Sequence, residues 1–384
     1  MRTAARMKGI APFYVMELLA RAKELEAEGR SIIHMEVGEP GFELPEEVKQ
    51  AGRDALDAGR THYTAATGIP ELRTAVARYY ADYGVTVDPS RVVITPGSSG
   101  ALQLVMGVLF NNGEEVIMTD PCYPCNKHFV LTFGAVPKLL PVDAGSNFQL
   151  TAEKVAEAWG PQTRGVIVAS PSNPTGTLLE EPELEKIFQV VEKNDGVLIV
   201  DEIYHKLVFG RPSCTALALS DRIIVLNSFS KYHGMTGLRV GWMVVPEDLI
   251  APLTRLTQNL FISPPSLSQY MALRSLESDC TAIFEERRRT FEKRRDLLLA
   301  GLRKLGFIIP AVPEGAFYIY ADCSAFSADS MSFCYALLEN AGVAITPGKD
   351  FGTHEAASHI RFACTGSSAE IEEALRRLHT FLQN

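Results

Sequence analysis

The residues best suited to chemistry are a lysine and an arginine that follow an apolar run at 223–226. Lys231 closes the sequence Ser228-Phe229-Ser230-Lys231, among small hydroxyl side chains, and Arg239 lies eight positions later. A lysine in a partly desolvated pocket has a lowered pKa and becomes an amine nucleophile. An arginine can bind a phosphate through two parallel hydrogen bonds. The pair suggests a lysine that forms a Schiff base with a phosphorylated aldehyde, against the plainer interpretation of a solvated strand end.

Polar turns after other apolar runs could supply the rest of such a site. Ser98 and Ser99 lie in a glycine-flanked turn that opens a predicted helix, where N–H groups and hydroxyls form an anion site or an ordinary N-cap. Asp201 ends the apolar run 196–200, and a carboxylate buried there needs a partner. That partner could be a pyridinium nitrogen or a structural salt bridge. Tyr204 could reach the phenolic oxygen of the same ring.

Two further turns contain side chains that suit a planar ligand. Asn173 lies in a proline-rich turn, and its bond to Pro174 is a candidate for the cis isomer, although most such bonds are trans. Tyr123 could stack on a flat ring or equally serve as a core or surface aromatic. It lies between Cys122 and Cys125, a spacing of redox and zinc sites, but no second pair completes one. The histidines show no metal-ligand spacing.

The elements that must position these residues alternate between strands and helices from about 91 to 245. Short β-branched apolar runs predict strands at 91–95, 115–119, 165–169, 196–200, 223–226 and 238–244. Helical periodicity predicts helices at 70–80, 100–110 and 181–194. The alternation predicts an α/β fold with a largely parallel sheet. The polar turns would then line one crevice at the carboxyl ends of its strands.

The C-terminal third has a different pattern. A charged helix is predicted at 281–305, where Glu285 and Arg289 form an i,i+4 pair, so its charge run is most simply a solvated face. Strands at 316–321, 343–346 and 359–363 and a final amphipathic helix at 368–382 follow. We expect a smaller α+β domain that the N-terminal segment joins.

Composition limits the class of protein. The chain has 384 residues, 46% of them hydrophobic and 22% charged, which is typical of a soluble globular protein with more than one domain. A net charge of -9 argues against a nucleic-acid surface, and no apolar run is long enough to span a membrane. The seven scattered cysteines fit reduced thiols, and the basic N-terminus lacks a signal core. We therefore expect a cytoplasmic protein that binds neither nucleic acid nor membrane.

The motifs, in this order, resemble those of the class I/II aminotransferases, pyridoxal-phosphate enzymes of fold type I in the aspartate aminotransferase superfamily. They are Val37-Gly38-Glu39-Pro40, Tyr63 with Gly68-Ile69-Pro70-Glu71-Leu72-Arg73, Asn173-Pro174-Thr175-Gly176, Asp201-Glu202-Ile203-Tyr204, Ser228-x-x-Lys231 with Arg239, and Arg361-Phe362-Ala363. The resemblance implies a large cofactor-binding domain at 41–279, with a mostly parallel seven-stranded sheet. It implies a small α+β domain formed by 1–40 together with 280–384.

The resemblance also implies how the cofactor, pyridoxal 5′-phosphate, would be held. Lys231 would form the Schiff base with it and move the proton between substrate Cα and cofactor C4′. Asp201 would pair with the pyridinium nitrogen, Asn173 and Tyr204 would bond the ring oxygen, and Tyr123 would stack on the ring. The phosphate would be held by Ser98, Ser99, Ser228 and Arg239.

Two further implications concern the substrate and a second copy of the chain. Arg361 would bind the substrate α-carboxylate, assisted by Asn173 and the backbone of Gly38; taken alone, it is an ordinary strand arginine. Tyr63 would reach the cofactor phosphate of the neighbouring subunit, which implies a homodimer with shared sites. The implied reaction transfers an amino group from an L-amino acid to a 2-oxo acid.

The nature of the amino donor depends on two positions. Aspartate-specific relatives tend to place a lysine in the phosphate loop and a serine in the N-terminal segment to meet the side-chain carboxylate. Here the matching residues are Ser99 and Ile10, with Phe13 nearby. An apolar segment over the pocket would leave a second carboxylate unpaired, which is costly. We expect a neutral donor, such as alanine or a larger apolar or aromatic amino acid, with 2-oxoglutarate as a candidate acceptor.

Two alternatives use the same fold. A pyridoxal-phosphate C–S β-lyase would use the same lysine, aspartate and arginine, and would release pyruvate and ammonia without an acceptor. The fold also serves as the effector domain of some transcription regulators, which carry a basic DNA-binding module ahead of it. The acidic chain, whose motifs begin by Val37, disfavours that second alternative.

Overall fold

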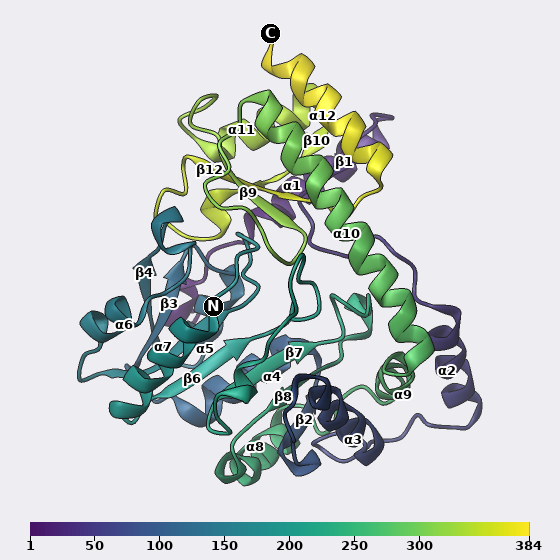
Figure 1. Cartoon of the computed structure of the whole chain (residues 1–384), viewed down its shortest axis with the longest axis vertical. Coiled ribbons are helices and arrows are strands. Elements are labelled where there is room, and N and C mark those ends of the chain that lie inside the picture. Colours follow the sequence, from purple (N-terminus) through teal and green to yellow (C-terminus); the bar gives the residue numbers. More distant parts are fainter. Residues whose placement is uncertain (384) are drawn as a thin grey trace.

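The computed structural model describes residues 1–383 and is built around a seven-stranded sheet (Figure 1). The strand order is β2-β8-β7-β6-β5-β3-β4. The strands are β2 (Val92–Thr95), β3 (Glu115–Asp120), β4 (Val136–Pro141), β5 (Thr163–Ala169), β6 (Val197–Asp201), β7 (Ile224–Ser228) and β8 (Gly241–Val244). Five strands pair in parallel, and β8 runs antiparallel to both of its neighbours, β2 and β7. The predicted α/β fold with a mostly parallel seven-stranded sheet is confirmed.

Six of the seven strands lie close to their predicted positions, and the sequence analysis missed β4. This strand forms the edge of the sheet, pairing with β3 alone, and its side chains are exposed or half-buried. It also carries Pro137 and Pro141, and proline is tolerated in strands mainly at such edges. An edge strand without a continuous apolar run therefore gives little sequence signal.

Helices cover both faces of the sheet because its buried strands are apolar on both sides. In β2, for example, Val93 packs into one hydrophobic cluster, whereas Val92 and Ile94 pack into the other. The first cluster includes residues of α4 (Gly97–Leu109), α5 (Pro124–Thr132) and α8 (Glu247–Leu260). The second includes residues of α3 (Pro70–Tyr79), α6 (Ala152–Ala158) and α7 (Glu181–Lys193).

A smaller α+β part lies above this sheet in Figure 1 and confirms the predicted second region. Its antiparallel sheet has the order β11-β12-β9, formed by Thr346–Pro347, His359–Ala363 and Tyr318–Asp322. The N-terminal strand β1 (Ile33–His34) pairs in parallel with β10 (Val343–Ala344), so the first residues join the last third of the chain. The helices nearby are α1 (Tyr14–Ala27), α11 (Ser330–Ala336) and α12 (Ser368–Leu382).

The two parts are linked by α10 (Ser278–Leu305), a 28-residue helix that runs along the right of Figure 1. Its lower end lies near α2 (Glu46–Asp57) and α9 (Ser266–Ser275). Because α10 continues across residue 280, the boundary at 279/280 falls in its first turn. The domain limits 41–279 and 1–40 with 280–384 stay a prediction.

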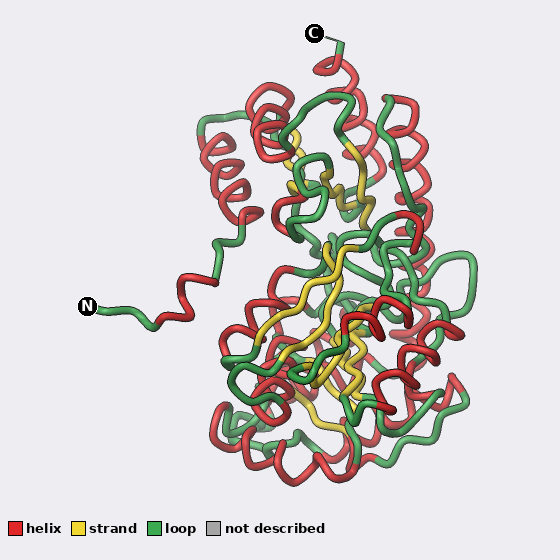
Figure 2. The backbone as a smooth tube through the Cα atoms, turned by 90° about the vertical axis from the view of Figure 1, so that its left-hand side faces the viewer, coloured by secondary structure: helices red, strands yellow, loops and turns green. Residues whose placement is uncertain are grey.

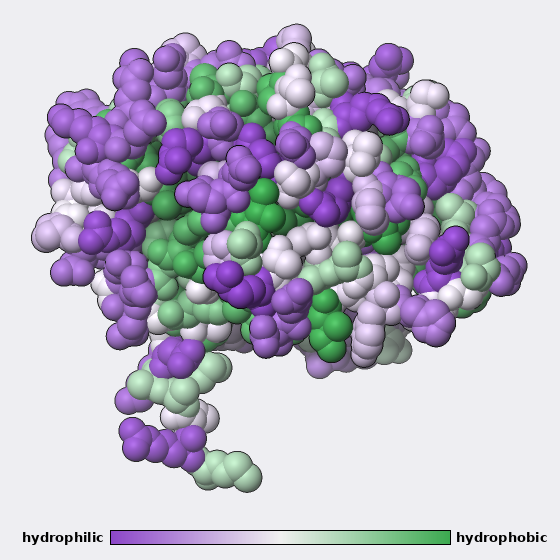
Figure 3. All heavy atoms as spheres, turned by 90° about the horizontal axis from the view of Figure 1, so that it is seen from below, coloured by the Kyte–Doolittle hydropathy of each residue, from purple (hydrophilic) through white to green (hydrophobic). Residues whose placement is uncertain are grey.

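The N-terminal segment projects from the body of the protein in Figure 2 and carries a short 3-10 helix, Ala5–Gly9. The face seen in Figure 3 is mostly hydrophilic, with hydrophobic side chains gathered near its middle. Within residues 1–383, no helix is long and apolar enough to cross a membrane.

Candidate active site

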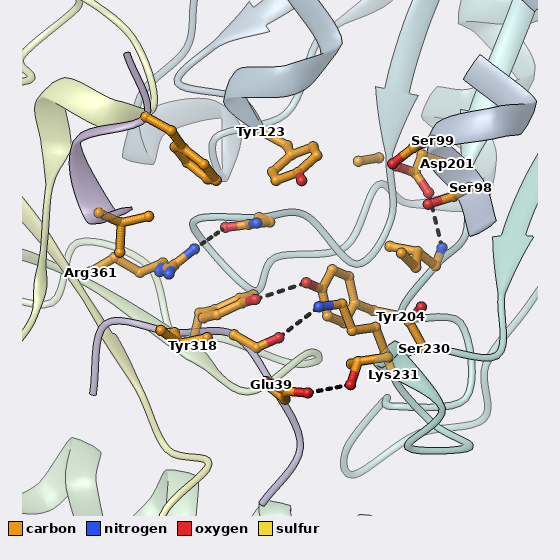
Figure 4. Close-up of a pocket in the computed structure, with 18 of the residues that line it drawn as sticks. Glu39, Ser98, Ser99, Tyr123, Asp201, Tyr204, Ser230, Lys231, Tyr318 and Arg361 are labelled. Carbon is orange, nitrogen blue, oxygen red and sulfur yellow. Dashed lines mark hydrogen bonds between the residues drawn. The ribbon is translucent and has the colours of Figure 1, made fainter. Parts of the chain in front are cut away.

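One cavity of about 280 Å³ lies where the carboxyl ends of the parallel strands meet the smaller sheet (Figure 4). Its lining includes ten of the predicted site residues: Gly38, Ser98, Ser99, Tyr123, Asn173, Asp201, Tyr204, Lys231, Arg239 and Arg361. Most of them follow the ends of β2, β3, β5, β6 and β7, as the strand-end argument predicts. The structure therefore brings together groups that are up to 323 positions apart, from Gly38 to Arg361.

Lys231 lies three residues after β7, with its amine directed into the cavity. The Nζ atom donates a hydrogen bond of 2.6 Å to the carbonyl oxygen of Gly38. Burial lowers the pKa of this amine to about 8, and the neighbouring positive charge of Arg361 adds to the effect. Glu39 acts in the opposite direction. A lysine with this pKa has a substantial neutral fraction near neutral pH, as an amine nucleophile or base requires.

Gly38 is required at its position by its close approach to Tyr318. A β-carbon added to Gly38 would lie 1.7 Å from the hydroxyl oxygen of Tyr318. That hydroxyl is hydrogen bonded at 2.8 Å to the hydroxyl of Tyr204. The glycine thus lets the N-terminal segment approach the tyrosine pair and present its carbonyl to Lys231.

Asp201 is the last residue of β6 and is 6% exposed. Burial raises the pKa of its carboxyl group to about 6, whereas a hydrogen bond of 3.1 Å from the backbone N–H of Ile203 and the charge of Lys231 lower it. A buried carboxylate of this kind favours a cationic partner in the cavity.

Arg239 and the first turn of α4 form a cationic corner of the cavity. Ser98 and Ser99 are the second and third residues of α4, where backbone N–H groups carry a partial positive charge. A β-carbon on Gly97, whose φ is +70°, would lie 2.5 Å from the Arg239 guanidinium. Arg239 also has a positive φ of 50° and donates a hydrogen bond to the carbonyl oxygen of Thr236. The corner suits an anion such as a phosphate group.

Ser228, predicted as a phosphate ligand, is not among the residues that line the cavity. Its side chain is buried, and its hydroxyl lies within hydrogen-bond distance of the Ser230 hydroxyl and of the carbonyl oxygen of Val240. Ser230, which the sequence analysis did not single out, does line the cavity. In this structure Ser228 contacts the lining through Ser230, and its direct contact with a phosphate stays a prediction.

Arg361 comes from β12, in the smaller sheet, and is 5% exposed. Its guanidinium donates a hydrogen bond of 2.8 Å to Oδ1 of Asn173 and another to the carbonyl oxygen of Glu36. It lies over the Tyr318 ring, 4.2 Å from the centroid. The Nε atom is buried without a hydrogen-bond partner in the structure. Arg361 thus retains an unused donor, as a site for a carboxylate needs.

One wall of the cavity, contributed by the N-terminal part of the chain, is apolar. It is formed by Phe13, Val15 and Met16, at the start of α1, and Phe13 contacts the edge of the Tyr123 ring with centroids 6.5 Å apart. Apolar residues of the N-terminal segment do line the cavity, as predicted, and Phe13 is one of them, but Ile10 is not. Ile10 lies in the extended segment between the 3-10 helix and α1, and the chain first reaches the cavity at Phe13.

Tyr318 is a further lining residue that sequence reasoning missed. It lies at the start of β9, inside a predicted strand, and nothing local separates it from a core aromatic. Thr236 was also missed; its hydroxyl donates a hydrogen bond to the Glu39 carboxylate at the cavity edge. Both depend on packing between segments distant in sequence.

Two expectations fall outside the cavity. Tyr63 is 79% exposed and does not line it, so its contact with a neighbouring subunit stays a prediction.

Cys122 and Cys125 are free thiols, and burial raises the pKa of Cys122 to about 12, which disfavours a reactive thiolate. In the part of the chain that the structure describes, no group of three or more His, Cys, Asp or Glu side chains could hold a metal ion. The Asn173–Pro174 bond is cis.

Comparison with known proteins agrees with this geometry. Residues 30–378 match the family "Aminotransferase class I and II". A valine–pyruvate aminotransferase of Mycobacterium tuberculosis is 42% identical over 97% of both chains. A (5-formylfuran-3-yl)methyl phosphate transaminase of Methanocaldococcus jannaschii is 35% identical over 98% of both.

A solved structure of an aminotransferase from Mycobacterium tuberculosis superposes with a TM-score of 0.96, at 41% identity, covering 100% of this chain and 99% of its own. The match extends over both sheets and therefore over every element that lines the cavity. Sequence and structure agree over the whole chain, and the chain belongs to the class I and II aminotransferases of the aspartate aminotransferase superfamily.

Proposed function

We propose that this aminotransferase uses pyridoxal 5′-phosphate and prefers a neutral, apolar L-amino acid as its donor. The observation that carries the proposal is the buried Lys231 amine, with a pKa lowered to about 8, between the Asp201 carboxylate and Arg361. This supports the proposal because a nucleophilic amine would then share the cavity with a partner for a ring cation and a partner for a carboxylate.

The described residues fit the cofactor. The missing side chain of Gly97 leaves space beside the Arg239 guanidinium, and the α4 N-terminus adds N–H donors and serine hydroxyls for the phosphate. The buried Asp201 carboxylate would pair with the ring nitrogen and keep it protonated. Asn173 and Tyr204 would donate to the ring oxygen, and Tyr123 would pack on the ring face.

When bound, the cofactor supplies an aldehyde carbon and an electron-withdrawing ring that acidifies the substrate Cα–H bond. The rest of the chemistry belongs to the chain. Arg361 would hold the substrate α-carboxylate and so orient Cα towards Lys231. Lys231, as a neutral amine, would remove the proton from the substrate Cα and deliver it to the cofactor carbon C4′. The apolar wall of Phe13, Val15 and Met16 would exclude water.

The charges of the cavity favour a neutral donor. Three cations line it. Each would already have a role, with Lys231 as base, Arg239 at the phosphate and Arg361 at the α-carboxylate. No cation remains among the described lining residues for a second carboxylate, and Glu39 would repel one. An acidic side chain would therefore lose its hydration without gaining a partner. The valine–pyruvate relative, whose donor is apolar, supports this preference.

The test is a single-turnover measurement on the cofactor-loaded protein. Each L-amino acid is added in turn, the cofactor absorbance is followed, and the keto acid is quantified. Valine, alanine or an aromatic donor should convert the cofactor to its amine form with one equivalent of keto acid, and aspartate should react more slowly. A faster reaction with aspartate would contradict the donor preference. Pyruvate and ammonia released from a cysteine-type substrate without acceptor would indicate the C–S β-lyase instead.

Lys231→Ala provides the control for the chemistry. The variant should retain cofactor, since Asp201, Arg239 and the α4 N-terminus remain, and it should lose turnover. Normal transamination by Lys231→Ala would exclude this assignment of the base.

We also propose a cytoplasmic homodimer in which Tyr63 contacts the cofactor phosphate of the other subunit. The large exposure of the Tyr63 ring and the seven free thiols support this arrangement. Sedimentation should give twice the 42.1 kDa mass of the chain. Tyr63→Phe should weaken cofactor retention at protein concentrations where the dimer persists, and a monomeric active enzyme would contradict the proposal.

A further inference from the structure

A buried carboxylate far from the known motifs holds the apolar wall in place. Asp350, 3% exposed, accepts hydrogen bonds from the backbone N–H groups of Tyr14 at 2.8 Å and Val15 at 2.9 Å. These are the first two residues of α1, and the residue before them, Phe13, makes no side-chain capping bond. Asp350 therefore caps α1 from a position 335 residues away in the sequence.

The capped turn is the part of α1 that lines the cavity. Phe13, Val15 and Met16 precede or belong to it, so their positions depend on where the first turn is anchored. A carboxylate at a helix N-terminus satisfies otherwise unpaired N–H groups and interacts favourably with the helix dipole. The segment before α1 projects from the body of the protein (Figure 2), so the hydrogen bonds to Asp350 anchor this turn together with the burial of Val15 and the contact between Phe13 and Tyr123.

The loop that carries Asp350 is itself fixed against the substrate side of the cavity. The ring of Phe351 lies against the Arg361 guanidinium, 4.8 Å from the ring centroid. The carbonyl oxygen of Phe351 accepts a hydrogen bond of 2.9 Å from the N–H of Cys122, next to Tyr123. The same short loop thus contacts the carboxylate-binding arginine, the Tyr123 turn and the apolar wall.

A second aspartate fixes the other end of this loop. Asp120, the last residue of β3, accepts hydrogen bonds from the N–H and hydroxyl groups of Thr353 and from the N–H of His354. A β-carbon on Gly352 would lie 1.6 Å from the Asp120 carboxylate, so the loop backbone is held close to the sheet. One anchored loop thus contacts both the first turn of α1 and Arg361.

We propose that Asp350 is a positioning residue that sets donor preference, because it holds Phe13, Val15 and Met16 at a fixed distance from Arg361. The inference rests on the proposed function for the identity of the donors. It goes beyond that function by assigning side-chain selection to a carboxylate that contacts neither donor nor cofactor. An apolar donor side chain gains affinity only where the wall stays in contact with it.

The experiment compares cofactor-loaded Asp350→Ala and Asp350→Asn with the unchanged enzyme. KM and kcat are measured for valine, which should touch the wall, and for alanine, whose single methyl group should barely reach it. Loss of the cap should raise KM for valine about tenfold in Asp350→Ala, with a change of about twofold or less in the kcat for both donors. KM for alanine should change by about threefold or less. Asp350→Asn keeps one acceptor oxygen, so its KM for valine should lie between the values of Asp350→Ala and the unchanged enzyme.

A second readout is independent of activity. Amide hydrogen exchange in the peptide that covers the first turn of α1 should accelerate about tenfold in Asp350→Ala. The control is Asp329→Ala, which removes the N-cap that an exposed aspartate provides to α11 and should leave both the α1 exchange rate and the donor preference unchanged. If Asp350→Ala does not fold, the same two measurements on Asp350→Asn decide the question.

Unchanged exchange at the start of α1, or an equal rise of KM for valine and alanine, would overturn the proposal. An enzyme that transaminates no neutral donor would instead overturn the proposed function. In that case the exchange measurement would still confirm or reject Asp350 as the anchor of the wall.

Discussion

The Lys231 amine is the group whose reactivity the structure predicts most sharply. Burial, followed by the nearby charge of Arg361, lowers its pKa from 10.5 to about 8. At pH 7 about one in ten such amines is neutral, against about three in ten thousand at a pKa of 10.5. The neutral, nucleophilic fraction of Lys231 is therefore about 300 times that of an ordinary lysine at this pH.

The assay is modification of the cofactor-free protein with trinitrobenzenesulfonate across a pH series, with the Lys231 peptide quantified by mass spectrometry. The rate at Lys231 should rise about fivefold from pH 7 to pH 8 and level off above about pH 9, since the amine is then mostly neutral. Ordinary exposed lysines should gain about tenfold per pH unit over the same range. A tenfold gain per unit at Lys231 would refute the reasoning.

Arg361→Gln separates the two causes of this pKa. The variant keeps the amine buried but removes the neighbouring positive charge, so the pH of half-maximal rate should move upward and remain below 10.5. Arg222→Gln, which changes an exposed arginine, should leave the profile unchanged. A downward movement in Arg361→Gln would show that the sign of the charge effect is wrong.

Three further predictions follow from the structure. Gly97→Ala should weaken retention of pyridoxal 5′-phosphate in equilibrium dialysis, because the new methyl group would lie 2.5 Å from the Arg239 guanidinium at a φ of +70°; unchanged retention would contradict this. Asp201→Asn should stabilise the cofactor-free protein by up to about 3 kcal/mol at neutral pH, while it weakens cofactor binding. The sign follows from the pKa of Asp201, which is about 6 in the folded protein and 3.8 in the unfolded chain. Below pH 3.8 the carboxyl is protonated in both states, and as the pH rises through 6 the buried group becomes charged and the folded state loses stability. Urea unfolding should therefore show the gain near pH 7 and little of it near pH 4, and a gain independent of pH would argue against the buried charge. Phe284→Ala, which removes a fully buried ring, should cost about 3–5 kcal/mol, whereas the exposed Leu56→Ala should change stability by less than about 0.5 kcal/mol in the same titration.

The large sheet was largely predictable because each of its buried strands is a short, continuous apolar run. Six strands lie within a few residues of their predicted positions, and β12 and α12 have the predicted bounds. The edge strand β4 was missed because only half of its surface is buried, so its side chains carry little hydrophobic signal. The antiparallel direction of β8 was also not predicted, since strand direction depends on the path of the connecting chain.

The sequence by itself determined the residues at the strand ends, because their position relative to an apolar run is a local property. Lys231, Asp201 and the serines of α4 were assigned on that basis, and all of them line the cavity. Arg361 was different: its local sequence is that of any strand arginine, and only a resemblance to a known family pointed to it.

Only the tertiary structure decided which distant groups meet. Asn173 and Arg361 are 188 residues apart and share a hydrogen bond, and Asp350 caps a helix that begins 336 residues earlier. Tyr318 became a site residue because Gly38 lets the N-terminal segment approach it. Such contacts are fixed when the two parts of the chain pack against each other, and that packing depends on the summed burial of many side chains rather than on any local pattern.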